Sequence, residues 1–160
     1  MRRPTILALV LAGIVALLDQ ASKLWVLDFF AARGQDSVVV LPIFNLVLVG
    51  NRGVSFGLFN GAEVSGTLVF AALAVVIVAL LLWWLVRAAG PRQRAALGLI
   101  IGGALGNVFD RLYRGAVVDF LDFHWGAWHW YAFNVADAAI CIGVALIALD
   151  SLLGEKPRDG

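Results

Sequence analysis

Apolar residues gather into four stretches of this chain, each at or near the length that crosses a membrane. A helix needs about 20 apolar residues to span the roughly 30 Å hydrocarbon core of a bilayer. We therefore expect helices at about 5–26, 64–86, 95–111 and 132–150. The second stretch contains no charged residue, whereas the third is short and rich in glycine. The pattern predicts an all-α polytopic membrane protein with four transmembrane helices, folded as a single integral membrane domain over 1–160.

The two segments that join these helices on one side, 31–62 and 113–131, are more than simple linkers. Residues 37–59 are rich in Val, Ile and Phe and are interrupted by Pro42 and several glycines. This composition favours short strands and turns, so we expect a small β-rich periplasmic platform between the first and second helices. The second segment carries aromatic residues that favour the boundary between lipid and water: Trp125, Trp128, Trp130 and Tyr131.

Composition and charge agree with a membrane protein and give its orientation. The chain is 62% hydrophobic and 14% charged, against about 45–50% apolar and about 25% charged residues in a typical soluble domain. A net charge of +1 gives no reason to expect a nucleic-acid partner. Cationic residues favour the cytoplasmic side, and seven of twelve fall on the side of both termini: Arg2, Arg3, Arg87, Arg92, Arg94, Lys156 and Arg158. Both termini are therefore expected in the cytoplasm.

Polar residues inside three of the apolar stretches share one depth. At about 1.5 Å per helical residue, Asp19 lies roughly 21 Å from the inner end of its helix. The same rise places Asn107 at roughly 18 Å, and Asp110 and Asp137 at roughly 22 Å. Ionisable residues are costly in lipid and mark functional sites. A common layer of such groups predicts one site just below the outer surface.

The spacing of these polar residues places them in pairs on the same face of each helix. Residues three or four apart share a helix face, and each helix shows such a pair: Asp19 with Lys23, Asn107 with Arg111, and Asn134 with Asp137. Between the third and fourth stretches, Asp119 lies inside the apolar run Val117–Leu121. A carboxyl group is not expected in such an apolar run unless it contacts a specific partner or ligand.

Structural interpretations compete with functional ones for the helix residues. Asp19 and Lys23 fit a buried ion pair that fixes helix register. Asn107 and Arg111 fit hydrogen bonds to loop carbonyls or to an acid. Asp110 fits an ion pair with the adjacent Arg111 at the helix end.

Residues outside the helices and the single cysteine have similar interpretations. Asp122 is expected to be a solvated loop acid, and Asn51 a turn residue by default. His124 and His129 are expected at the membrane interface, because no clustered ligand set accompanies them. Cys141 lies in an apolar run and fits a small packing residue. For Asp119 and Asp137, composition alone leaves the structural and functional interpretations balanced.

Four ordered sequence blocks resemble those of the lipoprotein signal peptidase family, also called signal peptidase II. They are DQASK at 19–23, NRGVSFG at 51–57, GNVFDRLYRGAVVDFLDF at 106–123 and FNVAD at 133–137. The resemblance covers essentially the whole chain. Ser55 departs from it, since an alanine is common there.

The resemblance implies an activity and its residues. Members are bacterial inner-membrane aspartic endopeptidases that remove the signal peptide from diacylglyceryl-modified prolipoproteins, just before the lipidated cysteine. Their two catalytic aspartates fall at Asp119 and Asp137 here. Supporting residues map by motif to Asp19, Lys23, Asn51, Asn107, Asp110, Arg111 and Asn134.

The resemblance also implies the surroundings of the site. It implies no cofactor and no metal, contact with membrane lipid, and inhibition by globomycin-like cyclic peptides. The expected location is the bacterial cytoplasmic (inner) membrane, with the active site near the periplasmic face.

Two other classes of membrane protein remain as alternatives. A small transporter or proton-relay protein also uses intramembrane carboxylates, but it should spread them across the membrane depth or show repeat symmetry. A structural membrane subunit has no need of Asp119 in an apolar run.

Overall fold

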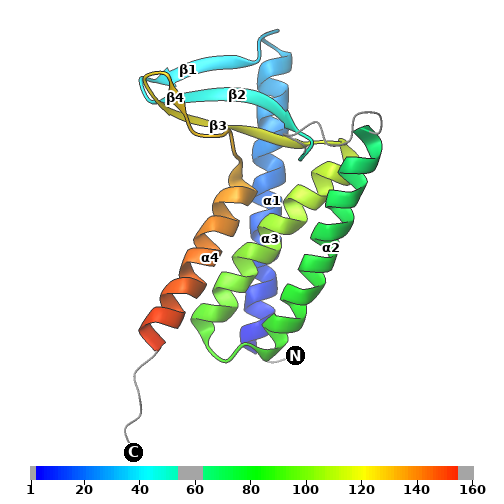
Figure 1. Cartoon of the computed structure of the whole chain (residues 1–160), viewed down its shortest axis with the longest axis vertical. Coiled ribbons are helices and arrows are strands. Elements are labelled where there is room, and N and C mark those ends of the chain that lie inside the picture. Colours follow the sequence, from blue (N-terminus) through cyan, green and yellow to red (C-terminus); the bar gives the residue numbers. More distant parts are fainter. Residues whose placement is uncertain (1–2, 54–62, 155–160) are drawn as a thin grey trace, which may run out of the picture.

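Four long helices stand side by side, and a small sheet lies across one end of them (Figure 1). The computed structural model describes residues 3–53 and 63–154, except the side chains of 63–68 and 153–154. The helices are α1 (Arg3–Ala31), α2 (Glu63–Arg87), α3 (Pro91–Tyr113) and α4 (Val135–Gly154). Within the described residues, all four are long and apolar enough to cross a membrane. The start of α1 and the end of α4 lie opposite the sheet. The predicted four-helix membrane fold is confirmed.

The helix ends differ from the expected ones for local reasons. Helix α3 begins four residues early, because Pro91 occupies its first turn after Gly90 and proline is favoured there. Helix α4 begins three residues late, at Val135. The preceding Phe133 is extended instead and exchanges backbone hydrogen bonds with Leu121.

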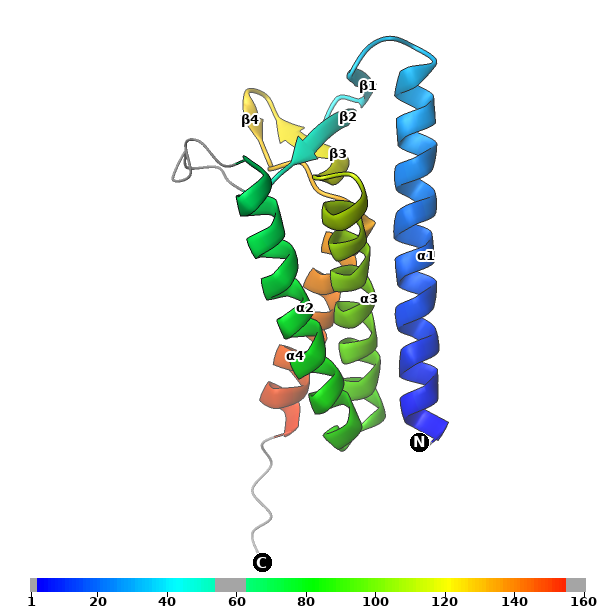
Figure 2. The ribbon, with the colours of Figure 1, turned by 90° about the vertical axis from the view of Figure 1, so that its right-hand side faces the viewer.

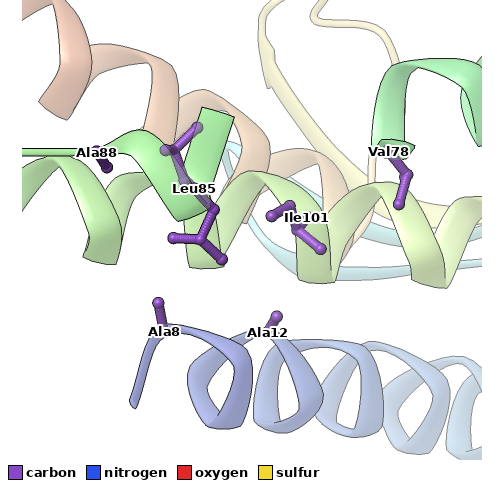
Figure 3. Packing of buried hydrophobic residues seen from close by; sticks show 7 residues of the cluster. Ala8, Ala12, Val78, Leu85, Ala88 and Ile101 are labelled. Atoms are coloured by element: carbon purple, nitrogen blue, oxygen red, sulfur yellow. The ribbon is translucent and has the colours of Figure 1, made fainter. Parts of the chain in front are cut away.

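Helix α3 is the centre of the bundle. It contacts α1, α2 and α4, whereas α1 and α2 pack on α3 rather than on each other (Figure 2). One buried apolar cluster joins α1, α2 and α3 near the end away from the sheet (Figure 3): Ala8, Ala12, Val78, Leu85, Ala88, Leu97 and Ile101. Lipid tails are as apolar as these side chains, so close packing rather than the hydrophobic effect holds such helices together.

Glycines on α3 allow this close packing. A Cβ added at Gly98 would lie 2.6 Å from the carbonyl oxygen of Ala8 on α1. Nearer the sheet, a Cβ at Gly106 would collide with the carboxylate of Asp19. The absence of a side chain thus lets the backbones of α1 and α3 approach closely at Gly98 and makes room for the Asp19 carboxylate at Gly106.

The sheet combines both outer segments. It has four antiparallel strands in the order β1, β2, β3, β4: β1 (Ser37–Leu41), β2 (Phe44–Asn51), β3 (Val117–Trp125) and β4 (Trp128–His129). The β-rich platform is confirmed, and β3 and β4 extend it with residues that follow α3. The register between β2 and β3 shifts between Leu46 and Val49, which places Val49 opposite Asp119.

An apolar cluster fixes the sheet to the end of α1. Val26 and Phe30 of α1 pack with Leu46 of β2 and with Val118 and Phe120 of β3. Val118 and Phe120 flank Asp119, so this packing sets the height of that carboxyl group beside the bundle.

Candidate active site

Lys23 lies at the junction of α1 and α3, with no exposed side-chain surface. Its Nζ donates to Asp19 Oδ2 at 2.8 Å and to Asn107 Oδ1 at 3.1 Å. It also forms an ion pair with Asp110 Oδ2 at 2.7 Å. The predicted ion pair of Asp19 and Lys23 therefore exists. Through Lys23 it also connects α1 to α3, rather than stabilising α1 alone. The predicted common depth is explained by these direct contacts.

The expected ion pair between Asp110 and Arg111 is wrong. Asp110 forms ion pairs with Lys23 and with Arg114, one helical turn further on. Arg111 instead donates weakly to the carbonyl oxygen of Asn107, at 3.4 Å. Adjacent helical residues point about 100° apart, whereas residues four apart share a face.

Asp137 is fixed by the start of α4. Asn134 immediately precedes this helix, and its Oδ1 accepts the backbone N–H of Asp137 at 2.9 Å. The carboxylate of Asp137 accepts the backbone N–H of Asn134 in return, at 3.3 Å. This reciprocal arrangement is a capping box, which satisfies two free N–H groups at the helix start. From α3, Asn107 Nδ2 donates to the other oxygen of Asp137 at 2.8 Å.

Asp119 is fixed by two amide side chains. Asn134 Nδ2 donates to Asp119 Oδ1 at 2.6 Å, and Asn51 Nδ2 donates to Asp119 Oδ2 at 2.9 Å. Asn51 Oδ1 also accepts the backbone N–H of Gly53 at 2.8 Å. Asn51 is thus both a turn residue and a partner of Asp119, so the two interpretations of it hold together.

Asn134 brings Asp119 and Asp137 together. This one residue, without exposed surface, contacts the carboxylates of both. Asn107 Oδ1 accepts from Lys23 and from Asn134, which turns its Nδ2 toward Asp137. The structure therefore gathers eight of the nine predicted site residues into one connected network, with Arg111 attached through the Asn107 carbonyl.

The environment of Asp119 favours proton exchange near neutral pH. Burial raises its pKa to about 6, and the neighbouring charge of Asp137 adds to the rise. Hydrogen bonds from Asn51 and Asn134 and the charge of Lys23 oppose that rise in pKa. A raised pKa caused by burial and a second carboxylate is typical of acid–base sites.

A cavity of about 380 Å³ opens beside Asp119. Its lining comes from the end of β2, from Asp119 and from the segment before α4: Val49, Gly50, Asn51, Arg52, Asp119, Tyr131 and Ala132. A ligand on the sheet side can therefore reach this carboxyl group.

Three polar residues outside the predicted set also contact buried carboxylates. Gln20 and Arg114 contact Asp110, and Asn45 Nδ2 donates to Asp122 at 2.8 Å. Arg114 follows Asp110 by four positions, and Gln20 is a polar residue at the same depth as Asp19. Those two signals were present in the sequence.

Two expectations outside the site are wrong. Asp122 is buried rather than solvated, because Asn45 and His129 both bond to its carboxylate across the sheet. Cys141 is exposed on α4 rather than packed inside. His124 and His129 stack on each other with ring centroids 4.9 Å apart. Ser55 lies outside the described residues.

Metal-ligating side chains do not gather in the described part of the chain. Across 3–53 and 63–154, no three His, Cys, Asp or Glu side chains are placed to hold a metal ion.

Comparisons with known proteins identify relatives over most of the chain. The family model described as signal peptidase (SPase) II matches residues 11–153. A lipoprotein signal peptidase of Rhodopseudomonas palustris is 47% identical over 91% of this chain and 92% of that protein. The lipoprotein signal peptidase of Beijerinckia indica is 42% identical over 96% of this chain and 92% of its own length.

Solved structures extend the agreement to the fold. A bacterial membrane enzyme determined at 1.9 Å resolution superposes with a TM-score of 0.75 at 29% identity, covering 93% of this chain and 94% of that one. A second, at 2.3 Å, gives a TM-score of 0.74 at 28% identity, covering 96% and 93%. On these matches over nearly its whole length, the chain belongs to the signal peptidase II family.

Proposed function

We propose that this chain is an aspartic endopeptidase that removes the signal peptide from prolipoproteins, with Asp119 and Asp137 as its catalytic pair. The observation that carries the proposal is the shared contact of both carboxylates with Asn134. Two acids placed this closely, next to a cavity, match the needs of acid–base hydrolysis of a peptide bond. The curated relatives named above are lipoprotein signal peptidases, which supports the substrate class.

The proposed mechanism uses one proton shared by the pair. Two close carboxylates do not both ionise cheaply, so the pair holds a single proton near neutral pH. The ionised member takes a proton from water as that water attacks the scissile carbonyl carbon. The protonated member donates to the carbonyl oxygen, and a proton then passes to the leaving amine as the C–N bond breaks. The proton belongs to the pair, so neither residue is assigned as its resting holder.

The remaining predicted residues support this pair. Asn51, Asn107 and Asn134 donate to its carboxylate oxygens and fix their directions. Asp19 acts at α4, because its Oδ1 accepts the backbone N–H of Ala136 at 3.0 Å, next to Asp137. Lys23 links this support to Asn107.

We further propose how the enzyme lies in its membrane. The sheet and the catalytic pair face the periplasm, and both termini lie in the cytoplasm of a bacterial cell, across the inner membrane. In this orientation a diacylglyceryl-modified cysteine holds the scissile bond at the outer surface of the bilayer, level with the pair. Globomycin-like cyclic peptides are expected to compete at the same site.

The transporter alternative finds less support. The four acidic residues buried in the described part of the chain are Asp19, Asp110, Asp119 and Asp122. All four lie at or near the sheet, so no series of buried acids crosses the bundle there.

Cleavage of a diacylglyceryl-modified prolipoprotein by the purified protein tests the proposal. Asp119→Asn and Asp137→Asn should each reduce turnover by about 10²–10⁴-fold, the usual contribution of a general acid or base. Asp28→Asn, at an exposed position on α1, is the matched control and should cleave at the wild-type rate. Unchanged turnover in either active-site variant would refute the catalytic pair. Equal cleavage of an unlipidated prolipoprotein would refute the requirement for lipid.

A further inference from the structure

Gln20 and Arg114 form a second layer of contacts around Asp110. Gln20 Nε2 lies 3.1 Å from Asp19 Oδ2, 3.1 Å from Asp110 Oδ1 and 3.2 Å from the carbonyl oxygen of Gly106. Arg114 Nη1 donates to Gln20 Oε1 at 2.8 Å and pairs with Asp110 Oδ1. The proposed mechanism uses neither residue.

Arg114 balances the charge of the buried network. Asp19 and Asp110 carry two negative charges, and Lys23, which forms ion pairs with both, supplies one positive charge. The side chains of these three residues have no exposed surface, whereas that of Arg114 is 15% exposed. With Arg114 the four charges sum to zero, and without it a net negative charge remains buried, which is costly.

The charge network around Asp110 is linked to each of the two proposed catalytic carboxylates through one intervening residue. Asp110 Oδ2 accepts the backbone N–H of Val118, at 3.2 Å, and Val118 directly precedes Asp119. On the other side, Lys23 donates to Asn107, which donates to Asp137. A change at Asp110 therefore reaches both members of the pair.

We propose that Arg114 and Gln20 are positioning residues for the catalytic pair, acting through Asp110. Arg114 supplies the charge that neutralises Asp110, and Gln20 fixes the direction of that carboxylate toward Lys23 and Val118. The inference rests on the proposed function.

Removing the charge of Arg114 should change the pH dependence of cleavage. The charged groups around the pair are Lys23 and Asp19 from α1, Arg111 and Asp110 from α3, and Arg52, which follows β2 and lines the cavity beside Asp119. In Arg114→Gln the network gains a net negative charge, which opposes ionisation of Asp119 and raises its pKa above about 6. The pair then keeps its single proton to a higher pH, so the alkaline limb of the kcat/KM profile moves to higher pH. A shift of about half a unit raises activity on that limb by roughly threefold relative to the activity at pH 5.

Two further variants separate charge from geometry. Arg114→Lys keeps the charge and should leave the alkaline limb in place. Gln20→Met removes hydrogen bonds without changing charge, so kcat should fall by about three- to tenfold with an unmoved limb. Arg33→Gln removes an arginine that lies over the ring of Phe29 at the end of α1, 3.7 Å from its centroid. It is the matched control and should leave both kcat and the limb unchanged.

The experiment measures kcat/KM of these variants from pH 5 to 9 on a diacylglyceryl-modified prolipoprotein, with thermal unfolding of each variant in detergent. A wild-type profile and wild-type kcat in Arg114→Gln would overturn the inference. If Arg114→Gln does not fold, a shift of the alkaline limb in Arg114→Lys, or wild-type kcat in Gln20→Met, overturns the inference instead. Cleavage by Asp119→Asn at the wild-type rate would overturn the proposed function itself, so the two failures are distinguishable.

Discussion

Two pairs of carboxylates lie next to each other in this protein and are stabilised in opposite ways. The cation-held pair, Asp19 and Asp110, shares Lys23, and Asp110 also pairs with Arg114. The amide-held pair, Asp119 and Asp137, accepts hydrogen bonds from neutral asparagine side chains and from the backbone N–H of Asn134. A cation at hydrogen-bond distance favours the charged form of a carboxylate strongly, whereas an amide favours it less.

This difference assigns different tasks to the two pairs. The cation-held pair joins α1, α3, α4 and β3 at fixed distances. The amide-held pair keeps its positions while remaining able to exchange a proton. A site for acid–base chemistry needs both properties, and here separate carboxylates supply them.

The largest expected effect is the loss of the cation in the cation-held pair. Lys23→Met removes the cation that pairs with both Asp19 and Asp110. Removal of one member of a buried ion pair typically lowers the free energy of unfolding by about 3–5 kcal/mol. Thermal or denaturant unfolding in detergent measures this loss. Arg87→Met is the control: this exposed arginine lies over the ring of Trp83, and its loss should cost less than about 1 kcal/mol. Equal stability of the two variants would show that Lys23 does not hold the bundle together.

Next in size is the effect of the amide that joins the members of the amide-held pair. Asn134→Ala removes the hydrogen bonds to Asp119 and Asn107 and the cap of α4. A hydrogen bond to a charged group contributes about 1.5–3 kcal/mol, so kcat/KM should fall by roughly 10- to 100-fold. Asn45→Ala removes a similar buried amide that bonds to Asp122 instead. It should cleave normally, and similar losses in both variants would contradict a special role for Asn134.

A smaller effect is expected at the exposed partner of Asp119. The hydrogen bond from Asn51 lowers the pKa of Asp119, so Asn51→Ala should raise that pKa above about 6. The pair then keeps its shared proton to a higher pH, so activity that needs this proton persists to a higher pH. We expect the alkaline limb of the pH–rate profile to move up by about half a unit. A limb that moved down would contradict this account of the site.

The smallest effect concerns Asp122, a carboxylate held by an amide and an imidazole on the sheet. Burial raises its pKa, but hydrogen bonds from Asn45 and His129 outweigh that effect and leave its pKa below the ordinary value. Its stabilising contribution is therefore present above about pH 3.9 and lost as pH falls through the lowered pKa. Asp122→Asn should cost about 1 kcal/mol at pH 7, with normal cleavage.

Unfolding of both proteins at pH 7 and at pH 3 tests this sign. The difference between wild type and Asp122→Asn should shrink in acid. A difference that grew in acid would mean that the carboxylate does not stabilise the sheet.

The helices and the common depth of Asp19, Asn107, Asp110 and Asp137 were predictable, because helical rise and residue spacing are local properties. The same rules identified the pair of Asp19 and Lys23. The same spacing rule favours pairing of Asp110 with Arg114, four positions further on, over the adjacent Arg111 that was expected.

Contacts across the sheet were beyond a sequence argument of this kind. Asp122 is buried because β2 places Asn45 opposite it, and that register joins segments about 77 positions apart. The double role of Asn51 has the same origin, since the register shift before Val49 determines which side chains reach Asp119. No local pattern encodes a shift of this kind.

The central place of α3 has a consequence for the order in which the chain assembles. Helices α1 and α2 are synthesised first, yet both pack on α3 rather than on each other. Until α3 enters the membrane, α1 must carry Asp19 and Lys23 in lipid without Asn107 or Asp110. Because the two residues are four positions apart, they neutralise each other within α1 alone. The ion pair thus lowers the cost of placing α1 in lipid before α3 is inserted, and it supports the active site only afterwards.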